Sequence, residues 1–227
     1  MSKVVLNNLN KLFEVKNGTN VKAVNDFNLN LEEGEILALL GSSGCGKTTT
    51  LRMIAGFEKA TSGEIKIGGK LVNDLKPSDR NVAMAFEGYA LYPPLTVRDN
   101  IAFSLMREKR SKEEVEAKVQ EVSELLEITN ILERYPPSIS GGQQQRVSLA
   151  RALVRESEAL LLDEPMSQLE PQLRAVLRAR VKDYIQHNNK TVIFVTHDQT
   201  EAVALADKIA VMEQGDLKQL ASPYEIS

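Results

Sequence analysis

The sequence predicts an α/β fold in which a core of strands and helices is interrupted by a helical insertion. An unbroken apolar run at Ile36–Leu40 is typical of a buried parallel strand, and a glycine-rich loop and a helical pattern follow it. Two further buried strands are predicted at Leu160–Leu162 and Thr191–Val195, where strands and helices again alternate. Between Thr96 and Glu156 only helical patterns occur. We therefore expect an α/β core from residues 1–88 and 157–227, and a helical subdomain at residues 89–156.

The composition limits the class of protein. The chain has 227 residues, of which 42% are hydrophobic, so it can bury a sizeable core. Its net charge of -3 at pH 7 gives no support for nucleic-acid binding driven by bulk charge. No apolar run approaches the roughly 20 residues that a membrane helix requires, and the N-terminus has no signal-peptide pattern. Because Cys45 is the only cysteine, no internal disulfide can form, and we expect a soluble, cytosolic chain.

Several strands are predicted in the first part of the chain. Val4–Phe13 and Val21–Leu31 alternate apolar and polar residues, and Asn17-Gly18 between them is a hairpin signal. Glu33-Gly34 turns the chain into the buried strand at Ile36. A small hairpin is then predicted at Gly63–Gly69, and a short strand at Asn81–Phe86.

Two helix starts are predicted in the insertion. Thr96-x-x-Asp99 resembles a helix-start box, and Ser111-x-x-Glu114 is a capping box. Apolar residues recur after both boxes: Ile101, Phe103 and Leu105 after the first, and Val115, Val119, Val122 and Leu126 after the second. We therefore expect two amphipathic helices here.

The last third of the chain returns to alternating strands and helices. One helix face is marked by Leu173, Val176, Leu177, Val181 and Ile185. Asp198-x-x-Glu201 begins another helix, which is expected to run through Leu205. Gln214-Gly215 predicts a final hairpin.

The glycine-rich loop has the pattern G-x-x-x-x-G-K-T. It comprises Gly41, Ser42, Ser43, Gly44, Cys45, Gly46, Lys47 and Thr48, and a second hydroxyl follows at Thr49. Glycines let backbone N–H groups converge on one point, and a helix N-terminus adds partial positive charge, so we expect the loop to bind phosphate. Lys47 would contact the β- and γ-phosphates, and the Thr48 hydroxyl would ligate Mg²⁺. A turn that merely resembles the motif is the alternative, but the strand before it and the helix after it, ended by Gly56, favour the nucleotide.

Cys45 lies within this loop. Oriented amides and the neighbouring Lys47 favour a thiolate, so we expect a reactive cysteine that bound ATP protects. A buried, inert thiol is the alternative.

A second candidate nucleotide motif follows the Leu160–Leu162 strand. The strand ends in Asp163, Glu164 and Pro165. Ligands of open α/β sheets bind at the carboxyl ends of strands. We therefore expect Asp163 to bind Mg²⁺ and Glu164 to polarise the water that attacks the γ-phosphate. An acidic surface turn is the alternative, and the presence of the glycine-rich loop argues against it.

Ser140, Gly141, Gly142 and Gln143 predict another helix start. Ser140 and Gln143 form a capping box, and the two glycines expose the first amides of the helix. Such a helix N-terminus suits an anion. Taken alone, the stretch could equally be an ordinary glycine-rich N-cap.

These motifs together resemble the ATPase subunits of ABC transporters. The resemblance covers essentially the whole chain and rests on the glycine-rich loop, S-G-G-Q-Q-Q-R at 140–146, L-L-L-D-E-P at 160–165 and V-T-H-D at 195–198. It implies a P-loop NTPase (RecA-like) core with an ABC-type antiparallel β subdomain, ATP and Mg²⁺ as cofactors, and ATP hydrolysis coupled to solute transport. The chain is similar in particular to ATPases of bacterial sugar and polyol importers of the maltose-importer type. That similarity rests on Tyr89–Pro93 with Thr96-Val97, on Leu51–Gly56 and on Ala206–Ile209.

The resemblance also implies roles for individual residues. Phe13 lies where an aromatic ring stacks on adenine, with a plain strand aromatic as the alternative. Ser140–Gln143 would contact the γ-phosphate of ATP held by a second ATPase subunit, a homodimer or a close paralogue, so that two chains enclose two ATP molecules. His197, at the end of a buried strand, would contact the γ-phosphate.

The implied partners are transmembrane permease subunits and, indirectly, an extracytoplasmic solute-binding protein, with no nucleic acid. Tyr89–Leu95 would receive a helix of the permease, with a packed loop as the alternative. The implied location is cytoplasmic, peripheral on the inner face of the cell membrane.

The chain departs from the family pattern at four positions. Glu87 stands where glutamine is usual. The family residue at this position contacts the metal and takes part in coupling to the permease, and the change to glutamate puts this metal-and-coupling contact in doubt. Glu170 replaces an aspartate whose contact is thought to cross the dimer. Ile139 in place of leucine and Thr49 beside Thr48 are conservative. Importer ATPases of this type usually continue past the Pro223–Ile226 stretch into a small β-rich regulatory domain, which these 227 residues do not include. Either the sequence is a piece of a longer chain or the chain lacks that control.

Two other functions remain open at this point. A non-transport ABC ATPase of DNA repair or chromosome structure would carry long coiled-coil insertions, and this insertion is short and lacks sustained heptads. A regulatory subunit that binds ATP without turnover is disfavoured by Glu164 and His197, while Glu87 and Glu170 keep it open.

Overall fold

The antiparallel part of the fold comes from the first third of the chain. The computed structural model describes residues 2–16 and 18–226, so Asn17 of the predicted hairpin turn lies outside the described residues. Strands β1 (Ser2–Glu14) and β2 (Asn20–Glu32) pair antiparallel, as the alternating pattern predicts. Strands β4 (Ser62–Ile67) and β5 (Lys70–Leu71) form a hairpin that extends this sheet from β1.

The second part of the sheet is mostly parallel. It contains β3 (Ile36–Leu40), β6 (Val82–Ala85), β7 (Ala159–Asp163), β8 (Val192–Thr196), β9 (Lys208–Glu213) and β10 (Asp216–Ala221). The order β9-β3-β8-β7-β6 is parallel throughout, and β10 pairs antiparallel with β9 through the predicted Gln214-Gly215 hairpin. A single register pair, Asp216 with Asn25, links β10 to β2 and joins the two parts.

Strand β3 is buried on both faces, which explains its unbroken apolar run. Leu37 and Leu39 belong to the core that contains α1 (Lys47–Ala55) and the antiparallel strands. Ile36 and Ala38 belong to the core on the other face, with the remaining helices. Helix α1 therefore lies between the two parts of the sheet, and Gly56 ends it in the left-handed conformation (φ 88°), as predicted.

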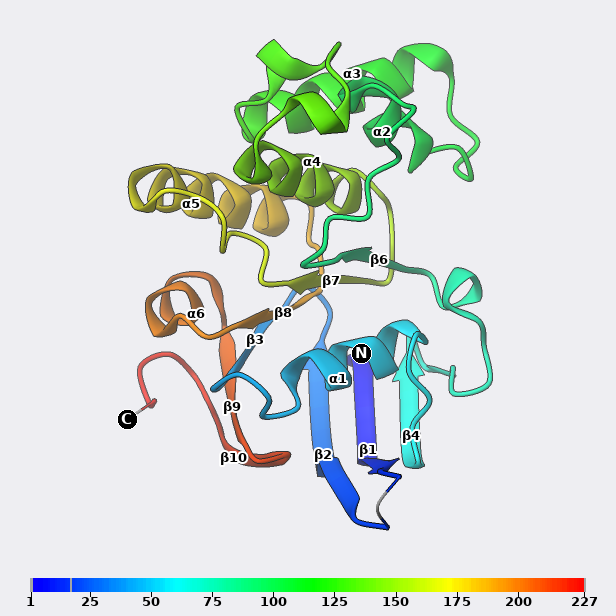
Figure 1. Cartoon of the computed structure of the whole chain (residues 1–227), viewed down its shortest axis with the longest axis vertical. Helices are drawn as coiled ribbons and strands as arrows, with labels where there is room; N and C mark the ends of the chain where they lie inside the picture. Colours follow the sequence, from blue (N-terminus) through cyan, green and yellow to red (C-terminus); the bar gives the residue numbers. More distant parts are fainter. Residues whose placement is uncertain (1, 17, 227) are drawn as a thin grey trace.

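The remaining helices lie on the opposite side of the parallel strands. They are α2 (Val97–Phe103), α3 (Lys112–Leu125), α4 (Gly141–Leu153), α5 (Pro171–His187) and α6 (Gln199–Leu205), with short 3₁₀ turns at Pro77–Asp79, Thr129–Ile131 and Pro136–Ser138. Of these helices, α4 and α6 pack against the strands, and α2 and α3 pack against α4. Residues 96–156 are all described and contain no strand, as expected. Figure 1 shows α2, α3 and α4 at one end of the molecule and β1, β2 and β4 at the other.

The predicted helix starts are confirmed, because they depend on local side-chain geometry. Ser111 and Ser140 each form the complete capping box, and the Thr96 hydroxyl accepts a hydrogen bond from the Asp99 amide. Asp198 caps α6 by accepting from the amides of Thr200 and Glu201.

Two predicted core positions are wrong. Val176 is 45% exposed and Phe103 is 43% exposed. At about 100° per residue, Val176 lies roughly 140° from the buried Val181, so it faces away from the line of buried residues on α5. Phe103 lies on the opposite side of α2 from Ile101 and packs edge-on against Tyr92, with 4.8 Å between the ring centroids.

Among the described residues, no helix combines the length and apolar character needed to cross a membrane.

Candidate functional site

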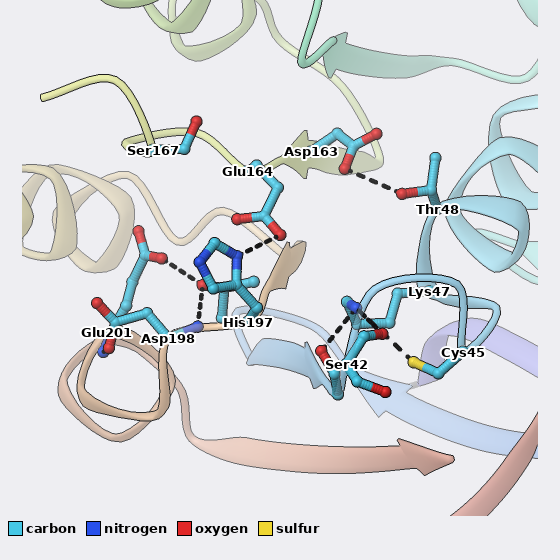
Figure 2. Close-up of polar contacts among 12 residues, drawn as sticks. Ser42, Cys45, Lys47, Thr48, Asp163, Glu164, Ser167, His197, Asp198 and Glu201 are labelled. Atoms are coloured by element: carbon cyan, nitrogen blue, oxygen red, sulfur yellow. Dashed lines mark hydrogen bonds and ion pairs between the residues drawn. The ribbon is translucent and has the colours of Figure 1, made fainter. Parts of the chain in front are cut away.

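Parallel strands bring the predicted site residues to one edge of the sheet. Strands β3, β7 and β8 are neighbours that run in the same direction, so the residues after their carboxyl ends meet. The glycine-rich loop follows β3, Glu164 follows β7 and His197 follows β8. Figure 2 shows the loop, the two acids and the histidine facing one another.

The glycine-rich loop wraps around its own lysine. Lys47 Nζ donates hydrogen bonds to the carbonyl oxygens of Gly41 (2.7 Å) and Ser42 (2.8 Å). Helix α1 begins at Lys47 after Gly46, which has φ 103° and whose Cβ, if present, would meet the Ala23 carbonyl oxygen. No side chain caps this N-terminus, so its first amides remain for a ligand.

The structure favours the alternative of a buried thiol for Cys45 over the predicted reactive one. The residue is 3% exposed and belongs to the core beneath the loop. Its Sγ lies 3.7 Å from Lys47 Nζ, on the inner side of the loop. The backbone amide of Cys45 donates to the Ser42 carbonyl oxygen over 3.3 Å, so this residue helps to close the loop and directs its thiol into the core.

Oxygen atoms suited to a metal lie beside the loop. The Thr48 hydroxyl donates to Asp163 Oδ1 over 3.3 Å, and both residues line a hollow of about 380 Å³ together with Glu87. Asp163 is 5% exposed, and its burial, followed by the negative charge of Glu87, raises the pKa of its carboxyl to about 6. This donor set of hydroxyl and carboxylates fits Mg²⁺.

Removing the charge of Asp163 is expected to stabilise the free chain. Because the pKa is raised from 3.8 to about 6 in the folded state, the folded chain binds a proton more tightly than the unfolded chain. Stability therefore falls as the pH rises through this window, and Asp163→Asn should raise the free energy of unfolding by about 1–2 kcal/mol at pH 7.5. Urea unfolding without nucleotide or Mg²⁺ measures it.

The stabilisation by Asp163→Asn should shrink at pH 5, where the folded wild-type chain is already largely protonated at Asp163. A variant that is no more stable than wild type at pH 7.5 would show that the buried charge is offset in the free chain.

Glu164 adopts a left-handed backbone conformation, with φ 47°. Its amide donates to the Val195 carbonyl oxygen (3.0 Å), and His197 Nδ1 lies 3.1 Å from its Oε1. The carboxylate is thereby aimed across the cleft at the residues after β8 (Figure 2). A carboxylate held beside a histidine in this way can accept a proton from water.

A buried network holds the segment that carries His197. The hydroxyl of Thr196, which is fully buried, donates to Glu201 Oε2 over 2.5 Å and accepts from the Asp198 amide over 3.0 Å. Burial raises the pKa of the Glu201 carboxyl. These bonds fix the backbone on either side of His197, whose ring is exposed.

Most of the predicted residues line a single cleft of about 780 Å³. Its predicted members are Ser42, Ser43, Gly44, Gly46, Lys47, Thr48, Thr49, Glu87, Glu164 and His197. Phe13 and Ser140–Gln143 do not line it. The Phe13 ring, 38% exposed, packs under Lys11 Nζ at 4.8 Å. At the N-terminus of α4, Ser140 and Gly141 are exposed, while Gly142 and Gln143 are half-buried. Glu170 is the N-cap residue of α5 and makes no side-chain capping bond.

Sequence reasoning missed four residues around the cleft. Ala23 of β2, Ser167 and Gln168 line it, and Gln145 of α4 hydrogen-bonds the segment after Glu164. Nothing in the sequence marks Ala23, because only the pairing of the two sheet parts brings β2 to the loop. Gln145 could have been found because it is a polar residue at a position of α4 that packs against the core.

Comparison with known proteins decides the family. Residues 24–167 match the family model described as "ABC transporter". The chain belongs to the ABC transporter family. The chain is 45% identical over 226 residues to the sn-glycerol-3-phosphate import ATP-binding protein UgpC of Brucella abortus, and 46% identical to the trehalose import ATP-binding protein SugC of Mycobacterium tuberculosis. Both alignments cover 100% of this chain, but only 63% and 56% of those relatives, so the chain spans about three fifths of their length.

Solved structures of ABC cassettes share the fold. A dimeric ATP-binding cassette in a post-hydrolysis state, bound to ADP and phosphate, matches with a TM-score of 0.88 at 30% identity. The match covers 97% of this chain and 98% of that one. The predicted α/β architecture with its P-loop core is thereby confirmed for this ABC transporter chain.

Proposed function

We propose that this chain is the ATP-hydrolysing motor subunit of an ABC importer for a sugar, polyol or related carbohydrate. The observation that carries the proposal is the composition of the cleft: phosphate loop, metal-binding oxygens, Glu164 and His197 meet there, while Ser140–Gln143 lie outside it. An ATP site that lacks Ser140–Gln143 within one chain fits an ATPase that works as a dimer, in which the second chain supplies these residues. Import ATP-binding proteins among the relatives support transport as the purpose of hydrolysis.

ATP binds through the residues at the start of α1. The amides of the glycine-rich loop and the N-terminus of α1 hold the phosphates, and Lys47 exchanges its two carbonyl partners for phosphate oxygens. Thr48, Asp163 and Glu87 would hold Mg²⁺, which neutralises charge on the phosphates when bound. Phe13 would stack on the adenine from the end of β1. Among the described residues, no cluster of three or more His, Cys, Asp or Glu side chains could bind a metal by itself, in keeping with a metal that arrives with its nucleotide.

Hydrolysis needs a positioned water and little covalent chemistry. Glu164 accepts the proton of the attacking water, and His197 contacts the γ-phosphate and keeps the Glu164 carboxylate in place. The pair of side chains favours turnover over a regulatory subunit that only binds ATP. A second copy, identical or a close paralogue, supplies the helix start at Ser140–Gln143 to complete each site.

A groove of about 440 Å³ is suited to a membrane-spanning partner. Phe57, Phe86, Tyr92 and Phe103 contribute apolar surface to it. Arg151 of α4 donates to the Ala90 carbonyl oxygen (2.7 Å) and lies 4.9 Å from the Tyr92 ring centroid, so it fixes one wall. We infer that a helix of a permease subunit docks here, which places the chain on the inner face of the membrane, with a solute-binding protein acting through the permease.

The proposal is tested by ATPase activity and by co-purification. The isolated chain should hydrolyse ATP with Mg²⁺ and form a dimer with ATP, and tagged chain should co-purify with integral membrane proteins from its own host. Association with chromosomal proteins and no membrane protein would instead favour a non-transport ABC ATPase. If the chain binds ATP without hydrolysing it, even when it co-purifies with integral membrane proteins, the regulatory role would be favoured.

Glu87 is expected to make ATP binding more dependent on Mg²⁺. Its carboxylate and that of Asp163 face the same hollow and should repel the nucleotide when no metal is present. In EDTA, Glu87→Gln should therefore improve ATP binding by up to about 1 kcal/mol. ATP affinity with and without Mg²⁺, for both forms, is the measurement. Identical Mg²⁺ dependence would leave Glu87 with a role only at the permease interface.

A further inference from the structure

Gln145 is a buried polar residue whose hydrogen bonds all reach one short segment. It lies on α4, two residues after Gln143, and is 3% exposed. Its Nε2 donates to the Glu164 carbonyl oxygen (2.9 Å) and to Ser167 Oγ (3.0 Å). Its Oε1 accepts from the Gln168 amide (2.9 Å). One side chain therefore connects α4 to both ends of the segment that follows Glu164.

This segment needs such support at its first residue. The left-handed conformation of Glu164 costs a residue with a side chain roughly 1–2 kcal/mol relative to the right-handed region. The Glu164 amide donates a hydrogen bond to the Val195 carbonyl oxygen, and Gln145 donates one to the Glu164 carbonyl oxygen. Without Gln145, the Glu164 carbonyl oxygen keeps only the longer hydrogen bond from the Ser167 amide (3.4 Å). The peptide after Glu164 can then rotate toward a relaxed conformation, which swings the carboxylate away from His197.

We propose that Gln145 is a positioning residue for Glu164. Gln145 does not line the cleft, and it acts by holding the Glu164 backbone in its left-handed conformation. The inference rests on the proposed ATPase function. Because α4 begins with Ser140–Gln143, Gln145 also ties the base of one ATP site to the helix start that serves the other.

The first test compares two glutamines on the same helix. Gln145→Met removes all three bonds to the segment and keeps the length of the side chain. Gln144→Met is the matched control, because Gln144 Nε2 donates instead to the Pro136 and Ile139 carbonyl oxygens. Gln145→Met should lower kcat on the order of 10²-fold, with ATP affinity and KM within about twofold of wild type. Gln144→Met should leave kcat unchanged.

The second test uses pH. Gln145→Glu keeps the shape and the acceptor for the Gln168 amide but, when ionised, loses the donor to the Glu164 carbonyl oxygen. Lowering the pH protonates the introduced carboxyl and restores a donor. The ratio of variant kcat to wild-type kcat should therefore rise as the pH falls. Dividing by the wild-type kcat at each pH corrects for the titrations of Glu164, Asp163, Glu87 and His197 as they occur in the wild-type chain.

The outcomes separate the two proposals. A wild-type chain that binds but does not hydrolyse ATP would overturn the proposed function. A hydrolysing wild type with unchanged kcat in Gln145→Met, or with kcat and ATP affinity lowered together, would overturn the role of Gln145 alone. If Gln145→Met does not fold, the pH arm decides, and a flat ratio for Gln145→Glu overturns the role.

Discussion

Glu164→Gln is expected to abolish ATP turnover while ATP binding is retained. The amide keeps the size of the side chain and loses the basic oxygen that faces the attacking water. A general base contributes about 10²–10⁴-fold to a rate, so kcat should fall by at least that lower factor. Steady-state hydrolysis and equilibrium ATP binding, measured on the same preparation, separate the two effects.

The same variant tests the dimer. Because ATP is no longer consumed, Glu164→Gln should form a stable dimer with ATP and Mg²⁺ on gel filtration, while wild type returns to monomer. Glu213→Gln, which removes an exposed negative charge at the end of β9, is the control and should behave as wild type. Only monomer at high protein concentration would contradict the model of two chains enclosing two ATP molecules.

The largest loss of stability is expected from Arg80→Met. Arg80 is 5% exposed, and burial lowers the pKa of its guanidinium. Its guanidinium donates to four backbone carbonyl oxygens: those of Met53 (2.8 Å), Ile54 (3.2 Å), Asn73 (3.1 Å) and Leu75 (3.0 Å). Methionine keeps the apolar stem and removes the donor from all four acceptors, two of them at the end of α1. The Met53 carbonyl oxygen still accepts from the Gly56 amide (3.3 Å), while the other three lose the guanidinium. We expect the free energy of unfolding to fall by about 3 kcal/mol or more.

Arg180→Met is the matched control for Arg80. Arg180 pairs with Glu127 at 2.9 Å, but both side chains are close to half exposed, so its loss should cost less than about 1 kcal/mol. Urea unfolding of both variants without nucleotide gives the comparison. Equal losses would mean that the four carbonyl oxygens find other partners or water.

The sequence by itself determined the elements whose cause is local. Capping boxes at Ser111 and Ser140 depend on a side chain and an amide three residues apart, so the letters predict them directly. The same holds for Gly56 at the end of α1 and for the strand–loop–helix order around Lys47. Burial of β3 on both faces was readable because a strand covered on each side has no polar alternation.

Only the tertiary structure decided which residues meet. Glu87 shares a hollow with Asp163 because β6 and β7 are parallel neighbours, although the two residues are far apart in the chain. Cys45 points into the core because the loop closes over the strands, and the thiol packs among their buried side chains. Gln145 reaches Glu164 because α4 packs on β7. A one-dimensional pattern records the period of burial, whereas the direction of a side chain and its partner depend on contacts between segments that fold together from distant parts of the chain.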